Sequence, residues 1–163
     1  MKQKSFFMAL GGVTAALAVT VMCLGTMIPL ATYICPVLCA VILQVVLQMC
    51  GRSTAWMWYA AVAILSVLLS PDKEAAALFV FMGYYPILKP RLDKLPFPWL
   101  WKLLLFNIAS FAMYAFLIWV MGMAELGDSF REAGAVLTVV TVILGNITFI
   151  MLDILLSRRV LKR

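Results

Sequence analysis

Long apolar stretches alternate with short polar segments along almost the whole chain. A helix that crosses a bilayer needs about 20 apolar residues, and barrel strands would instead show alternating segments of about ten residues, which this chain lacks. The second, third and fourth stretches are short for a full crossing, so we expect them to tilt little or to continue into the loops. The pattern predicts an all-α protein, a single bundle of six transmembrane helices at residues 6–24, 35–50, 54–70, 74–88, 98–122 and 133–157.

The basic residues between these stretches fall almost entirely on one side of the implied membrane. Positively charged loops stay in the cytoplasm, so both termini are predicted to be cytoplasmic. Only Lys73 and Arg131 then lie outside. The inner side holds Lys2, Lys4, Arg52, Lys89, Arg91, Lys94, Lys102, Arg158, Arg159, Lys162 and Arg163.

This topology predicts a labelling result. In a cysteine-free background, Asp128→Cys should react with an impermeant thiol reagent in intact cells, whereas Arg91→Cys should react only after permeabilisation. The reverse pattern would exclude the proposed orientation.

The composition leaves lipid as the main solvent of this chain. It is 66% hydrophobic and only 12% charged, which is too little polar surface to cover a water-soluble domain. The net charge of +6 follows from membrane orientation, so we expect no nucleic-acid partner.

The proline-rich segment 89–98 separates the first four apolar stretches from the last two. Neither half would bury its polar groups alone, so we expect a single domain.

Catalytic chemistry has little basis in this sequence. The chain has no histidine, the commonest general base and metal ligand, and it lacks the short motifs of intramembrane hydrolases. We therefore expect no catalytic residue, metal or cofactor. The cysteines form no Cys-x-x-Cys pair and are interpreted as packing residues, with a disulfide between Cys23 and Cys35 as the alternative.

Asp153 is the most informative ionisable residue, because a charge inside an apolar helix is costly unless it is paired or functional. Lys102 lies at a similar depth from the inner side, and Lys89 closes the fourth stretch. A structural ion pair of Asp153 with Lys102 or Lys89 is the leading interpretation. The alternatives are a helix-end residue that reaches water and a residue coupled to proton or ion transport.

A few uncharged polar residues lie at the depth of the bilayer centre. Asn146 is seven residues before Asp153, on nearly the same helix face, and Asn107 lies at a comparable level in the fifth stretch. The two amides are predicted either to hydrogen-bond each other or to contact a bound ligand.

The predicted outer loops differ in character. The uncharged segment from Gly25 to Pro36 has two prolines and is predicted to cover the outer mouth of the bundle, with Tyr33 as a candidate ligand contact. The next predicted outer segment, residues 70–74, has the pattern of a helix N-terminus, with Ser70 or Asp72 as the N-cap.

The first stretch carries a stripe of small residues at Gly11, Gly12, Ala15 and Ala16. Two small residues four apart allow another helix to approach closely. The stripe is predicted to pack within the bundle or against another subunit.

The size, six stretches, cytoplasmic ends, small-residue first helix and the loop with Pro29 and Pro36 together resemble the substrate-binding S component of energy-coupling factor (ECF) transporters. The resemblance covers the whole chain, although Gly-x-x-x-Ala replaces the usual Ala-x-x-x-Ala. It implies a bacterial plasma-membrane subunit that captures a vitamin-like micronutrient, with Tyr33, Asn146 and Asn107 as candidate contacts. A coupling membrane subunit and an ATPase pair would hydrolyse ATP, because this chain has no phosphate-binding loop. The alternatives are a small membrane scaffold similar to the MreD-like proteins of cell-shape complexes, without a ligand, and an intramembrane enzyme.

Overall fold

The computed structural model describes residues 2–25, 31–122, 139–140 and 142–157. These residues form helices, turns and bends but no strand, which confirms the predicted all-α class. The chain divides into two compact units, Met1–Lys94 and Leu95–Arg163. The division falls within the proline-rich segment 89–98.

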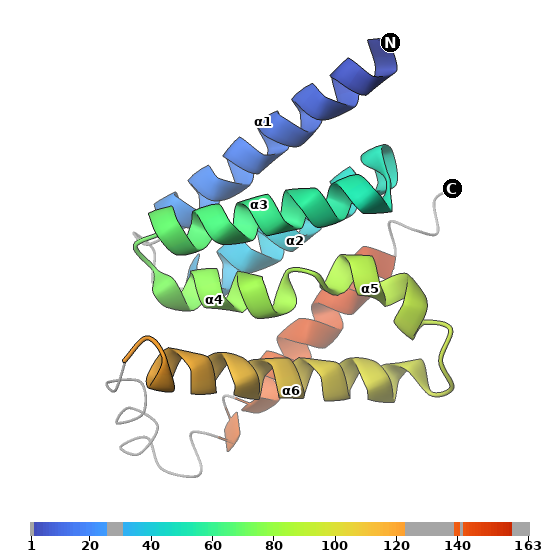
Figure 1. The fold of residues 1–163 in the computed structure, drawn as a ribbon. Coiled ribbons are helices and arrows are strands. Elements are labelled where there is room, and N and C mark those ends of the chain that lie inside the picture. The colour runs from blue at the N-terminus through green and yellow to red at the C-terminus, as the bar shows by residue number, and fades with distance from the viewer. Residues whose placement is uncertain (1, 26–30, 123–138, 141, 158–163) are drawn as a thin grey trace. The chain divides into compact units, whose positions relative to one another are not determined.

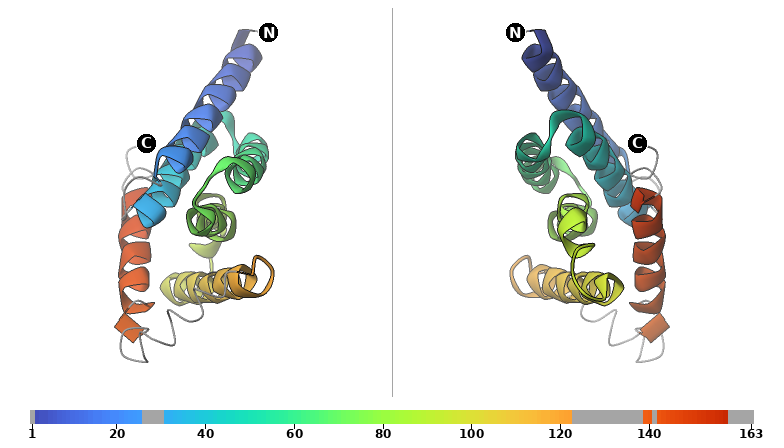
Figure 2. Two further views of the ribbon diagram at one scale, coloured as in Figure 1. Left: turned by 90° about the vertical axis from the view of Figure 1, so that its left-hand side faces the viewer. Right: turned by 90° about the vertical axis from the view of Figure 1, so that its right-hand side faces the viewer.

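The first unit contains α1 (Lys2–Leu24), α2 (Ala31–Cys50), α3 (Arg52–Leu69), α4 (Lys73–Met82) and α5 (Tyr85–Leu92). α1 packs against α2 and α3, and α2 also packs against α4 and α5 (Figure 1). Figure 2 shows the chain reversing between α2 and α3. Gly51 makes this reversal with a φ of 84°, a left-handed backbone that a residue with a Cβ rarely adopts.

Small and aliphatic side chains form the core of this unit. Ala18 of α1 and Cys39 of α2 are fully buried, and the Cys39 thiol approaches the Ala18 carbonyl oxygen at 3.5 Å. Residues this small let two helices approach closely, which favours dispersion contacts between their backbones. The core continues through Leu43, Val62, Ala76, Phe79 and Ile87.

The predicted fourth helix, residues 74–88, was wrong as a continuous element. α4 ends at Met82, and α5 begins at Tyr85. Pro86 explains the interruption, because it has no N–H for the Met82 carbonyl and its ring would collide with that carbonyl in a continuous helix. At the break, the Gly83 N–H donates to the Phe79 carbonyl at 2.6 Å.

The second helix begins four residues before the predicted residue 35, in agreement with the expectation that the short stretches continue into the loops. α2 begins at Ala31 and includes Pro36. Helical residues therefore occupy the second half of the segment that the sequence predicts to be a loop. Residues 26–30, including Pro29, lie outside the described residues.

The second unit contains α6 (Pro98–Trp119) and the apolar helix Val142–Ser157. Phe97 precedes α6 with a φ of 56°, a left-handed backbone conformation that is uncommon for residues other than glycine. α6 ends three residues before the predicted residue 122. Most of the N-terminal part of the last predicted helix, residues 133–138 and 141, lies outside the described residues.

Four described helices are long and apolar enough to cross a membrane: α1, α2, α3 and α6. Their outward side chains are largely hydrophobic, for example Met8 on α1, Leu68 on α3 and Phe111 on α6, each at least 70% exposed. Such surfaces are unfavourable in water and suit the acyl chains of a bilayer. These features support a membrane protein.

Candidate functional site

The first candidate site is a polar cluster where α2 and α4 begin. Asp72, one of the two predicted caps, is the N-cap of α4, and one of its carboxylate oxygens accepts the Ala75 N–H at 3.0 Å. Its other oxygen accepts the Thr32 hydroxyl of α2 at 2.8 Å. Both carboxylate oxygens therefore hold helix ends in place, and Asp72 has a structural role in this cluster.

Tyr33 lies beside this capping interaction. Its hydroxyl donates to a Glu74 carboxylate oxygen at 3.3 Å, and the residue is 44% exposed. Glu74 lies in the first turn of α4, where the helix dipole stabilises a negative charge. An aromatic ring and a carboxylate are thus presented together at one end of the first unit, a combination that suits cationic or amine-bearing ligands.

The end of α1 is tied to the same cluster. The Ser70 hydroxyl lies 3.3 Å from the Met22 carbonyl oxygen and 3.2 Å from that of Asp72. Lys73 turns back along α3 and donates to the Val67 carbonyl at 2.8 Å. The ends of α1, α2 and α4 are consequently held together by hydrogen bonds.

Asn107 and Asn146 lie in the second unit, on facing helices, and hydrogen-bond each other reciprocally at 2.9 and 3.2 Å. Each amide nitrogen also donates to a carbonyl of its own helix, that of Leu103 or Val142, at 2.8 Å. An amide group has two N–H donors, so both donors of each asparagine are used. A ligand that bound here would have to compete with these bonds.

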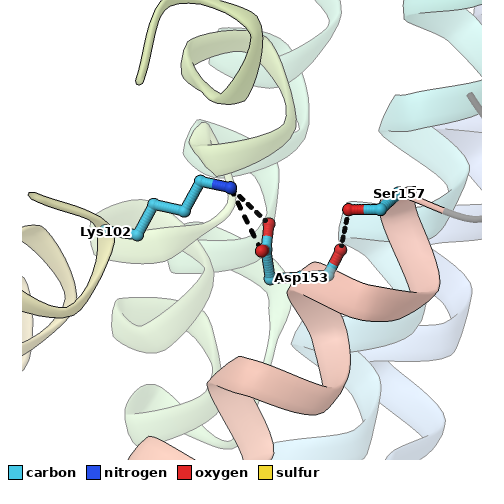
Figure 3. Close-up of polar contacts among 3 residues, drawn as sticks. All are labelled: Lys102, Asp153 and Ser157. Atoms are coloured by element: carbon cyan, nitrogen blue, oxygen red, sulfur yellow. Dashed lines mark hydrogen bonds and ion pairs between the residues drawn. The ribbon is translucent and has the colours of Figure 1, made fainter. Parts of the chain in front are cut away.

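Asp153 and Lys102 form an ion pair in the same helix pair (Figure 3). The ammonium nitrogen lies 3.3 and 3.1 Å from the two carboxylate oxygens, and the side chains are only 10% and 22% exposed for Lys102 and Asp153. The Ser157 hydroxyl donates to the Asp153 carbonyl at 2.8 Å. Lys89, the other candidate partner, belongs to the first unit, where its ammonium lies 5.9 Å from the centre of the Tyr85 ring.

Aromatic packing connects the two polar contacts of the second unit. The rings of Phe106 and Phe149 stack with their centres 4.6 Å apart. A Cβ added at Gly145 would lie 3.6 Å from the Phe106 ring, an ordinary van der Waals distance. α6 and the last helix therefore pack through an ion pair, an aromatic stack and an amide pair, and these contacts fix their register.

The small-residue stripe of α1 divides between two environments. Ala15 packs against the core of the first unit, while Gly12 and Ala16 are exposed. A Cβ added at Gly11 or Gly12 would meet no atom within 4 Å. Within the described part of the first unit, the Gly12 and Ala16 face is therefore open.

Sequence reasoning missed several polar contacts within the first unit. The Trp58 indole N–H donates to the Thr14 hydroxyl at 3.1 Å, and the Tyr59 hydroxyl donates to the Val80 carbonyl. Gln44 Oε1 and the Ser66 hydroxyl are buried without a hydrogen-bond partner in the described part of the chain. All these residues lie in apolar helices, where one polar residue gives no sign of its partner.

The cysteines and possible metal ligands add no further site. None of the four cysteines forms a disulfide, and no group of three or more possible metal ligands occurs among the described residues. No protein-family model, curated protein or solved structure matches the chain.

Proposed function

We propose that this chain is the membrane-embedded substrate-capture subunit of a micronutrient uptake transporter, similar to an ECF S component. The polar cluster of Thr32, Tyr33, Asp72 and Glu74 carries the proposal. It combines an exposed phenol with acidic groups at the end of the first unit that the charge pattern assigns to the outside. A vitamin-like ligand with a cationic or amine group would bind the Tyr33 ring and the Glu74 carboxylate.

In this proposal the chain has no catalytic role. It resides in a bacterial plasma membrane with both termini in the cytoplasm, and ATP hydrolysis belongs to a separate pair of subunits. A coupling membrane subunit would pack on the open Gly12 and Ala16 face of α1. Larger residues at these two positions would then block close helix approach and prevent co-purification of that subunit.

The proposed ligand site predicts selective stabilisation. One compound from a panel of vitamins should raise the unfolding temperature of the purified protein, because a ligand at 100 times its Kd stabilises the folded state by about 2.7 kcal/mol. Tyr33→Ala should abolish most of this shift without lowering expression. The control is Met57→Ala, an exposed position near the start of α3, whereas the polar cluster lies beyond the end of α3. This variant should leave the shift unchanged.

A second function is favoured by a different observation. Asn107 and Asn146 satisfy each other's amide groups, so these mid-helix polar residues have a structural explanation without a ligand. This favours a small membrane scaffold of the MreD-like kind. If no compound stabilises the protein and Gly12→Leu still disrupts a membrane complex, the scaffold replaces the transporter proposal.

A further inference from the structure

Basic residues lie where α3 begins and where α5 ends. The Arg52 guanidinium, at the start of α3, donates to the Ile87 carbonyl of α5 at 3.3 Å. In an α-helix the carbonyl of one residue points toward the amide of the residue four positions later, here Arg91. The Arg52 guanidinium therefore lies close to the backbone of Arg91. Lys94 continues the same turn, since its N–H donates to the Arg91 carbonyl at 3.2 Å.

Arg52, Arg91 and Lys94 are exposed, and none of them forms an ion pair with another residue that the structure describes. Arg52 uses one of its five N–H donors on Ile87. Neither Arg91 nor Lys94 has a side-chain hydrogen bond or ion pair with any described residue. Asp93 is the single acidic residue of the segment 85–97, so this surface retains a net positive charge. Like charges on one surface repel each other, and a bound anion would reduce this repulsion.

Apolar surface begins directly beside the basic cluster. Trp56 lies one turn after Arg52 on α3 and is 40% exposed, and Met57 is 64% exposed. α3 continues with exposed Ile64, Leu65 and Leu68. Tryptophan next to basic residues at the end of an apolar helix is typical of the headgroup region of a bilayer. A molecule bound here would meet positive charge at one end and hydrocarbon-like surface at the other.

We propose that Arg52, Arg91 and Lys94 bind the phosphate of an anionic phospholipid, with its acyl chains along Trp56 and the apolar face of α3. The guanidinium groups of Arg52 and Arg91 suit phosphate because each offers paired N–H donors in a planar arrangement. The adjoining apolar surface favours a lipid over an acidic protein partner, which would leave that surface uncovered. The site lies wholly within the first unit and does not depend on the proposed transport function.

Native mass spectrometry of the full-length protein in detergent tests this proposal. With added phosphatidylglycerol, the wild-type protein should retain bound lipid, whereas phosphatidylcholine should bind much more weakly. Arg91→Gln and Lys94→Gln should each weaken phosphatidylglycerol binding about fivefold, the effect expected for one basic residue near an anionic membrane. Neither side chain has a described bond, so both variants should fold normally.

The matched control is Lys73→Gln, which removes the same charge from the opposite end of the first unit and should leave lipid binding unchanged. An equal loss in this control would show a general charge effect and overturn the site. Unchanged binding in both Arg91→Gln and Lys94→Gln would also overturn it. Displacement of the lipid by millimolar inorganic phosphate would contradict a site that requires the acyl chains. Binding of an acidic protein at this surface in place of the lipid would also contradict the proposal.

Discussion

Asp153→Ala is expected to lower the free energy of unfolding by about 3 kcal/mol, because it removes the carboxylate that pairs with the buried Lys102 ammonium. The double variant Lys102→Met with Asp153→Leu should recover most of this loss, since it removes both charges and fills their space with apolar groups. Unfolding by denaturant titration in detergent would measure both values. The coupling between the two positions then follows from a double-mutant cycle.

Thr148→Ala provides the control within the same helix. The Thr148 side chain is exposed and its hydroxyl donates to the Leu144 carbonyl one turn earlier, so its loss should change stability by less than about 0.5 kcal/mol. A second double-mutant cycle, between Lys89 and Asp153, measures the coupling energy of the other candidate lysine for comparison with that of Lys102. A coupling near zero between Lys102 and Asp153 would show that the ion pair contributes nothing to folding.

Gly83→Ala is expected to destabilise the first unit by roughly 1–3 kcal/mol, the usual cost of inserting atoms into packed surroundings. A Cβ at this position would lie 2.5 Å from the Phe79 carbonyl oxygen and 2.7 Å from its ring. The φ of Gly83 is an ordinary −62°, so space and not backbone conformation requires glycine here. Thermal unfolding monitored by circular dichroism would measure the change.

Two other glycines make matched controls for this substitution. Gly12→Ala adds a Cβ in open space, and Gly145→Ala adds one at an ordinary contact distance from Phe106. Both should be neutral or slightly stabilising, because alanine favours a helix over glycine by up to about 1 kcal/mol. A Gly83→Ala variant as stable as these controls would show that the break between α4 and α5 adjusts without cost.

The helical class and much of the element order followed from the sequence because they depend on local properties. Long apolar stretches determine helices in a nonpolar environment, where the backbone has no other partner for its polar groups. The Asp72 cap is equally local, since the donor it binds is three residues away. The break at Pro86 was also readable in principle, because proline interrupts a helix whatever surrounds it.

The tertiary structure decided the pairings between distant residues. The sequence shows that Asp153 needs a partner, but Lys102 is 51 residues away, and only helix packing selects it. The same holds for Asn107 with Asn146, for Tyr33 with Glu74 and for Arg52 with the Ile87 carbonyl. Each side chain has several partners of suitable chemistry in the sequence. The register and rotation of packed helices determine which one comes within hydrogen-bond distance.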